Sequence, residues 1–138
     1  MLERLDQTTF THVCKDSGAS IGQHLRHMVE IFTLLINDYE AAEIDYSLRA
    51  RDIRIETDLA FATKKISYLQ TNYKQVDKPL ILKSYDQPFQ TSYNRELLYQ
   101  LEHIVHHKAI IKPIIKSLSC VELHEHFGYA RSTINYSQ

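Results

Sequence analysis

The sequence predicts an all-α protein, a bundle of helices that fills residues 1–138 as a single domain. Two observations point to this class. The chain holds only 3 glycines and 3 prolines, fewer than the many turns of an all-β fold require. Three long segments also carry apolar residues at alternating spacings of four and three, which average about 3.5 residues and are typical of helices packed with a left-handed supercoil.

The first predicted helix begins after Ser20, a residue that favours the N-cap position, and fades near Ala42. Its apolar stripe is Ile21, Leu25, Met28, Phe32 and Leu35. The second predicted helix ends before Pro79. Its stripe is Ile55, Leu59, Ala62, Ile66, Leu69 and Tyr73. We expect both stripes to face the core.

The third predicted helix is capped by Ser92 or Asn94. Its stripe is Leu97, Leu101, Ile104, Lys108, Ile111, Ile115 and Leu118. Pro113 lies inside this helix and removes one helical hydrogen bond, so a kink or an early stop is expected there. The preceding segment 76–93 is either a short extended piece around 80–82 or a long crossing loop. The tail 119–138 is expected to be irregular, with a turn at Gly128.

The charge balance excludes several classes of protein. Sixteen basic and 17 acidic residues leave a net charge of −1, whereas proteins that bind nucleic acid or an anionic membrane surface carry a basic excess. No apolar run is long enough to span a membrane. The first residues lack the pattern of a secretory signal, and two cysteines are too few for a disulfide scaffold. We therefore expect a cytoplasmic protein that binds neither nucleic acid nor membrane.

Histidines are the most informative residues of the chain. Of eight, His24 and His27 lie on the first predicted helix, and His103, His106 and His107 lie on the third. The spacing places His24 with His27, and His103 with His107, on one face of each helix beside its apolar stripe. Neutral imidazoles from two facing helices can converge on a metal ion inside a bundle and leave one position for water or a thiol.

Lys108 supports the metal site, and the lack of a glutamate beside the histidines limits the chemistry that the motif itself can supply. Lys108 stands on the third stripe where an apolar residue is expected, which indicates a wet or functional cavity beside His107. The chain lacks an HExxH motif, because Ile104 follows His103, so the motif supplies no glutamate base. The alternative is that the histidines are polar residues of the core and hold no metal.

Four stretches resemble the DinB/YfiT-like superfamily: SIGQHLRHMVEIF (20–32), IDYSLRARDIRIETD (44–58), SYNRELLYQLEHIVHHKAIIKP (92–113) and FGYARSTINY (127–136). The resemblance implies an antiparallel four-helix bundle whose three histidines hold a divalent metal, nickel or zinc. Only 19 residues precede Ser20, so the first helix of that bundle is expected to be short or missing in the segment 1–19, unless the chain is longer at its start. The seam left open would favour a homodimer.

Carried onto this chain, the resemblance implies His27, His103 and His107 as metal ligands, with His24 as the alternative to His27. His24 and His106 would then line the pocket, support the ligands by hydrogen bonds or complete the site as a fourth ligand. Glu30, one turn after His27, would orient a ligand, act as a base or form a surface salt bridge.

The resemblance also implies a function. Relatives include thiol-dependent transferases and isomerases and metal-dependent hydrolases, in which a metal-bound thiolate or water attacks a small-molecule substrate, with a low-molecular-weight thiol as a possible co-substrate. The alternative is a non-catalytic metal-binding or stress-response bundle. No catalytic residue is indicated by the sequence. We expect core packing to be the role of Tyr39, Tyr68, Tyr93 and Tyr99, with lining of the pocket as the alternative for each. The arginine-rich run 49–54 is expected to be a solvated helix face or a basic lip for an anionic thiol.

Overall fold

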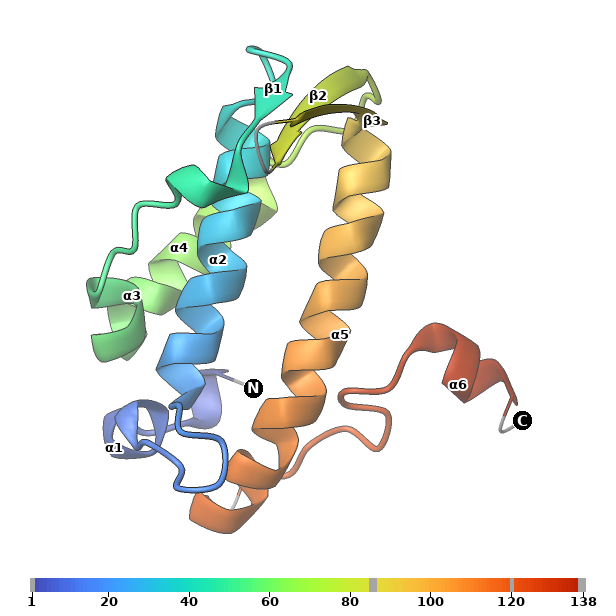
Figure 1. Ribbon diagram of the computed structural model, residues 1–138. Coiled ribbons are helices and arrows are strands. Elements are labelled where there is room, and N and C mark those ends of the chain that lie inside the picture. Colours follow the sequence, from blue (N-terminus) through green and yellow to red (C-terminus); the bar gives the residue numbers. More distant parts are fainter. Residues whose placement is uncertain (1, 85–86, 120, 137–138) are drawn as a thin grey trace.

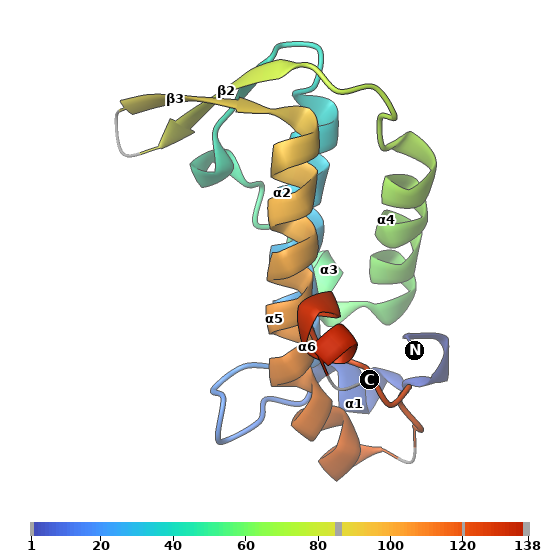
Figure 2. The same cartoon turned by 90° about the vertical axis from the view of Figure 1, so that its right-hand side faces the viewer.

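Three long helices and a small sheet across their ends form the protein (Figure 1). The computed structural model describes residues 2–84, 87–119 and 121–136. The central helix α2 (Ile21–Asn37) packs against both α4 (Leu59–Asn72) and α5 (Tyr93–Leu118). Figure 2 shows α4 well separated from α5, so α2 is the element that joins them.

The sheet overturns the predicted all-α class and the four-helix bundle; the fold is mixed α/β. The strand order in the sheet is β1 (Glu43–Ile44), β2 (Pro79–Ser84) and β3 (Gln87–Ser92). Strand β1 runs parallel to β2, and β2 runs antiparallel to β3. The two prolines of 76–93 are compatible with strands because Pro79 begins β2 and Pro88 lies on an edge strand. The extended alternative for this segment was therefore right, and the crossing loop was wrong.

Capping side chains fix where the helices begin. Ser20 accepts the backbone N–H of Gln23 and starts α2, and the Gln23 side chain accepts the Ser20 N–H in return. Ser92 caps α5 in the same way through the N–H of Arg95. The second predicted helix is divided into α3 (Arg54–Thr57) and α4, because the Asp58 carboxylate accepts the N–H of Phe61 and starts a new helix.

The buried face of α5 differs from the predicted stripe. Its buried residues are Tyr93, Glu96, Gln100, His107, Ile111, Ile114 and Ile115. Leu101 is 57% exposed, and Lys108 is exposed, with its amine 5.6 Å from the centroid of the Phe127 ring. The inference of a wet seam at Lys108 was therefore wrong, although the interface beside it is polar. Helix α5 also continues through Pro113 to Leu118, so the alternative of an early stop there was wrong.

The two ends of the chain carry only short helices, of which α1 (Gln7–Thr11) packs on α2 and α6 (Arg131–Tyr136) has no buried residue. A 3-10 turn, η1 (Leu2–Arg4), and the five-residue helix α1 replace a long first helix, and Phe10 of α1 is fully buried. The tail, predicted to be irregular, carries the short helix α6. The turn expected at Gly128 is present: its φ is +81°, and a Cβ there would lie 2.9 Å from the Ala109 Cα.

Two apolar clusters hold the helices together and leave a polar zone between them. The lower cluster contains Leu5, Phe10, Ile21, Leu25, Met28, Val29, Ile55, Ala62, Ile111, Ile114 and Ile115. The upper cluster contains Leu35, Ile44, Leu80 and Tyr93. Along α5 the histidines lie between these clusters. Among the described residues, none of the helices combines the length and the apolar character needed to cross a bilayer.

Candidate metal centre

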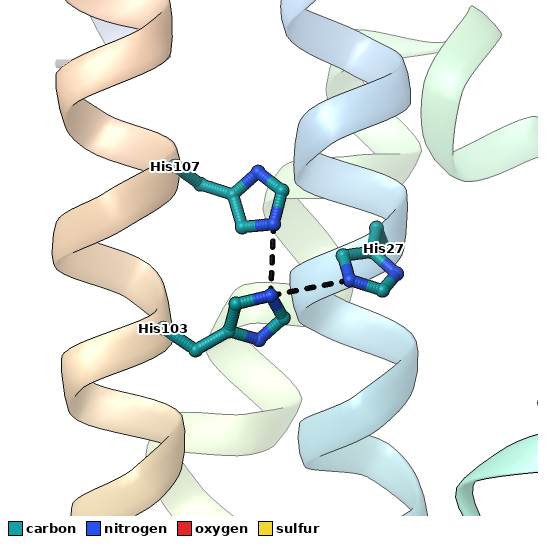
Figure 3. Close-up of side chains that lie close together, drawn as sticks. All are labelled: His27, His103 and His107. Carbon is teal, nitrogen blue, oxygen red and sulfur yellow. Dashed lines mark hydrogen bonds between the residues drawn. The ribbon is translucent and has the colours of Figure 1, made fainter.

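Three histidines from two helices meet where α2 contacts α5. His27 comes from α2, and His103 and His107 come from successive turns of α5 (Figure 3). His103 Nε2 lies 3.3 Å from His27 Nε2 and 3.0 Å from His107 Nε2. One ligand nitrogen from each of the three residues lies within 4.8 Å of the others. The structure therefore brings together the three residues that the sequence singled out.

The spacing of these nitrogens fits a transition-metal ion. Metal–nitrogen bonds of about 2.0–2.1 Å in a tetrahedral site place two ligand nitrogens about 3.3 Å apart. The two Nε2 separations at His103 are 3.3 and 3.0 Å. Three imidazoles and no carboxylate form a donor set suited to zinc, nickel or copper rather than to magnesium or calcium. The cluster could therefore hold such an ion.

Burial keeps the imidazoles in the neutral form that binds metal. Burial, followed by the neighbouring His103, lowers the pKa of His27 and of His107 from the ordinary 6.5 to about 4. Burial likewise lowers the pKa of His103 and of His24. At neutral pH a metal therefore meets lone pairs on these rings and need not displace a proton from them.

His24 takes a different place from His27. Its Nδ1 lies 3.0 Å from His107 Nδ1, on the opposite side of the His107 ring from the Nε2 that faces the cluster. If His107 Nε2 binds a metal, its Nδ1 carries the proton and donates to His24, which takes the place that a carboxylate, carbonyl or water usually holds behind a ligating histidine. The geometry thus favours His27 as the ligand from α2 and His24 as the support of His107.

The remaining candidates do not touch the cluster by hydrogen bonds. His106 is exposed, with its ring centroid 5.5 Å from that of His107. Glu30 is only 5% exposed, and its Oε1 accepts the backbone N–H of Asp52 at 2.5 Å. Glu30 therefore ties α2 to the segment before α3, and the surface salt bridge considered for it is not formed in the described part of the chain.

The sequence reasoning missed a polar row on α5 that continues upward from the histidines. Glu96 and Gln100 are 2% and 1% exposed, and with His103 and His107 they repeat the spacing of four, three and four. Glu96 accepts hydrogen bonds from the hydroxyls of Tyr46 and Thr91. The Gln100 amide is buried with no hydrogen-bond partner in the described chain. The same heptad spacing that identified apolar stripes could have found this row.

The four candidate tyrosines separate into different roles. Tyr99 stacks on His103 with ring centroids 6.0 Å apart and an interplanar angle of 22°. It also lines a cavity of about 1030 Å³ beside the sheet. Tyr93 is fully buried in the upper cluster, where Tyr39 packs edge-on against it. Tyr68 donates to the Asn37 side chain. Only Tyr99 among them borders both the histidines and a cavity.

Comparison with known proteins leaves the family open. No family model matches the chain, and no solved structure matches it. FK506-binding protein 5 of Rhizopus delemar is 34% identical over 109 residues, an alignment that covers 67% of this chain and 27% of that protein. The chain thus spans about a quarter of the length of the curated relative that it matches. Membership of the DinB/YfiT-like superfamily stays a prediction.

Proposed function

We propose that the chain binds one divalent ion, nickel or zinc, through His27, His103 and His107, and acts as a metal-dependent transferase or hydrolase of the DinB/YfiT-like kind. The observation that carries this proposal is the convergence of three neutral imidazoles on one point, with 3.0 and 3.3 Å between their Nε2 atoms. When bound by three protein ligands, such an ion leaves a position for water or a small thiol and lowers its pKa, which supplies a nucleophile near neutral pH.

The surrounding residues suit this role. With a metal on His107 Nε2, the His107 Nδ1–H donates a hydrogen bond to His24 Nδ1, which fixes the orientation of the His107 ring. The apolar residues Leu25 and Met28 on α2 and Ile111 on α5 pack beside the histidines and hold the two helices at a fixed distance. Tyr99 stacks on His103 and also lines the neighbouring cavity, which is large enough for a small-molecule substrate.

The name of the relative from Rhizopus delemar refers to FK506 binding. Because the match covers only 27% of that protein, it gives no reason to place FK506 binding in this chain. The proposal therefore depends on the histidines alone. Its competitor is a non-catalytic metal site, which requires a fourth ligand from the protein to close the coordination sphere.

Cobalt substitution separates the two possibilities. We would load the metal-free protein with Co²⁺ and add 2-mercaptoethanol while recording the absorption spectrum. An open site predicts a new sulfur-to-cobalt charge-transfer band in the wild type and none in His107→Ala, which removes a ligand. A cobalt spectrum that the thiol does not change would mean a closed site and would support the non-catalytic alternative.

A further inference from the structure

A cavity of about 1030 Å³ opens between the sheet and the beginning of α5. Its walls come from the turn η2 (Tyr46–Leu48) and the residues after it, from β2 and β3, and from the first turns of α5. Four cationic side chains line it: Arg49, Arg51, Lys83 and Arg95. This size accommodates a small organic molecule.

The charges on the cavity wall do not cancel. The two carboxylates on the wall already accept hydrogen bonds from neutral groups. Asp45 accepts from the N–H and the hydroxyl of Ser47, and Glu96 accepts from the hydroxyls of Tyr46 and Thr91. Lys83 is paired with Glu43, and the Arg95 guanidinium lies 3.8 Å from Glu96. Within the described ranges no ion pair involves Arg49 or Arg51. Two guanidinium groups therefore remain for a ligand.

The segment that carries these two arginines is held in place from below. Glu30, one turn from His27 on α2, accepts the N–H of Asp52 and so anchors the residue that follows Arg51. Arg51 itself has a φ of +53°, in the left-handed region that a non-glycine residue adopts only at a cost. The Asp52 side chain also binds the Arg54 guanidinium through both carboxylate oxygens. The conformation around Arg51 is thus fixed by specific contacts.

One residue of the cavity wall, Tyr99, also touches the histidine cluster. Tyr99 lines the cavity with one part of its surface and stacks on His103 with its ring. The positive charge of Arg49 also contributes to the lowered pKa of His27 and His103, so this side chain lies within electrostatic reach of both. A molecule held by the arginines would therefore lie beside Tyr99, the residue that stacks on His103.

We propose that the substrate of this centre carries a carboxylate or phosphate group that Arg49 and Arg51 bind in the cavity, a proposal that rests on the metal-dependent function above. Guanidinium groups match the planar geometry of carboxylates and phosphates and form charge-assisted hydrogen bonds to them. Binding at the arginines would position the reactive part of the substrate at the metal without using a metal ligand. The arginine-rich run 49–54 is then a recognition segment rather than a solvated helix face.

Calorimetric titration with two simple anions tests this assignment. Succinate and inorganic phosphate would each be titrated into metal-free protein, to distinguish a carboxylate site from a phosphate site. We expect at least one anion to bind and the double variant Arg49→Gln/Arg51→Gln to weaken it by about tenfold for each arginine removed. The matched control Lys64→Gln/Lys116→Gln removes the same charge from exposed positions outside the cavity and should change the affinity by less than about twofold.

Zinc binding is measured in parallel by competition with a chromophoric chelator. The arginine variant should bind zinc as the wild type does, which also shows that it is folded. If zinc binds but neither anion does, or if the arginine variant binds the anion like wild type, the anion assignment is wrong and the metal centre stands. If anions bind as expected but wild-type protein binds no zinc, the metal-dependent function fails and the substrate assignment fails with it.

Discussion

Metal binding by this chain should resist mild acid. The pKa values of His27 and His107 are lowered from 6.5 to about 4, first by burial and then by His103. The test lowers the pH of the binding assay from about 7.5 to about 5.5, a range in which an ordinary histidine takes up a proton. His27 and His107 should stay almost wholly neutral throughout it, and so remain available to a metal.

The size of the expected loss of metal affinity follows from the competition between a proton and the metal for the same ring nitrogen. Each ligand with a pKa of about 6.5 would weaken the apparent affinity about tenfold between these two pH values, and two such ligands would weaken it about a hundredfold. A ligand with a pKa of about 4 loses only a few per cent of its neutral form. The third ligand, His103, also has a lowered pKa, so the total loss should stay below about tenfold.

A chelator competition titration with zinc at both pH values measures this loss, once the proton binding of the chelator itself is corrected. Circular dichroism at both pH values checks that the protein is folded. This check is needed because the unfolded histidines bind more protons at the lower pH, so the metal-free fold loses stability as the pH falls from about 6.5 towards 4. A loss of affinity of a hundredfold or more would refute the assignment of His27 and His107 as buried neutral ligands.

Three further comparisons of variants test separate parts of the structure. Gly22→Ala should lower the free energy of unfolding by about 1–3 kcal/mol in urea titrations, because the new Cβ would lie within 2.2 Å of the Glu56 carbonyl oxygen; Ser67→Ala, on an exposed face, should be nearly neutral. Glu30→Ala should lower the free energy of unfolding by about 1–3 kcal/mol, because it leaves the Asp52 N–H unpaired. Its zinc affinity should change little, and a complete loss of zinc binding would instead make Glu30 a ligand. His24→Gln should weaken zinc about 10–100-fold, whereas His27→Gln should abolish stoichiometric binding; the reverse order would exchange their roles.

The starts of α2 and α5 and the histidine pairs were predictable because they depend on short-range chemistry, whereas the predicted end of α2 near Ala42 was too late, since α2 ends at Asn37. The cap at Ser20 is encoded within four residues, and the pairs His24/His27 and His103/His107 share helix faces through spacing alone. Pro113 was misleading for the same reason, since a local rule does not include the packing of Ile114 and Ile115 in the lower cluster, which holds the last turns of α5 in place.

The sheet was not predictable in the same way. Strand β1 has two residues, and its parallel partner β2 lies more than thirty residues further along the chain, so no local period reveals the pair. On α5, the stripe through Leu101 and Lys108 was predicted to be the buried face because all of its positions except Lys108 are apolar. The polar row through Glu96 and Gln100 is buried instead, because it faces Tyr46 and the histidines of α2. A polar interface thus takes the place of an apolar one.

One divalent metal ion should be held by His27, His103 and His107. The most direct test is metal analysis by mass spectrometry of untagged protein reconstituted with zinc or nickel, for the wild type, His107→Ala and the matched control His106→Ala. We predict about one ion per chain in the wild type and in His106→Ala, whose side chain is exposed, and almost none in His107→Ala. No bound ion in reconstituted wild-type protein, or equal metal content in His107→Ala, would contradict the claim and leave the histidines as polar residues of the core.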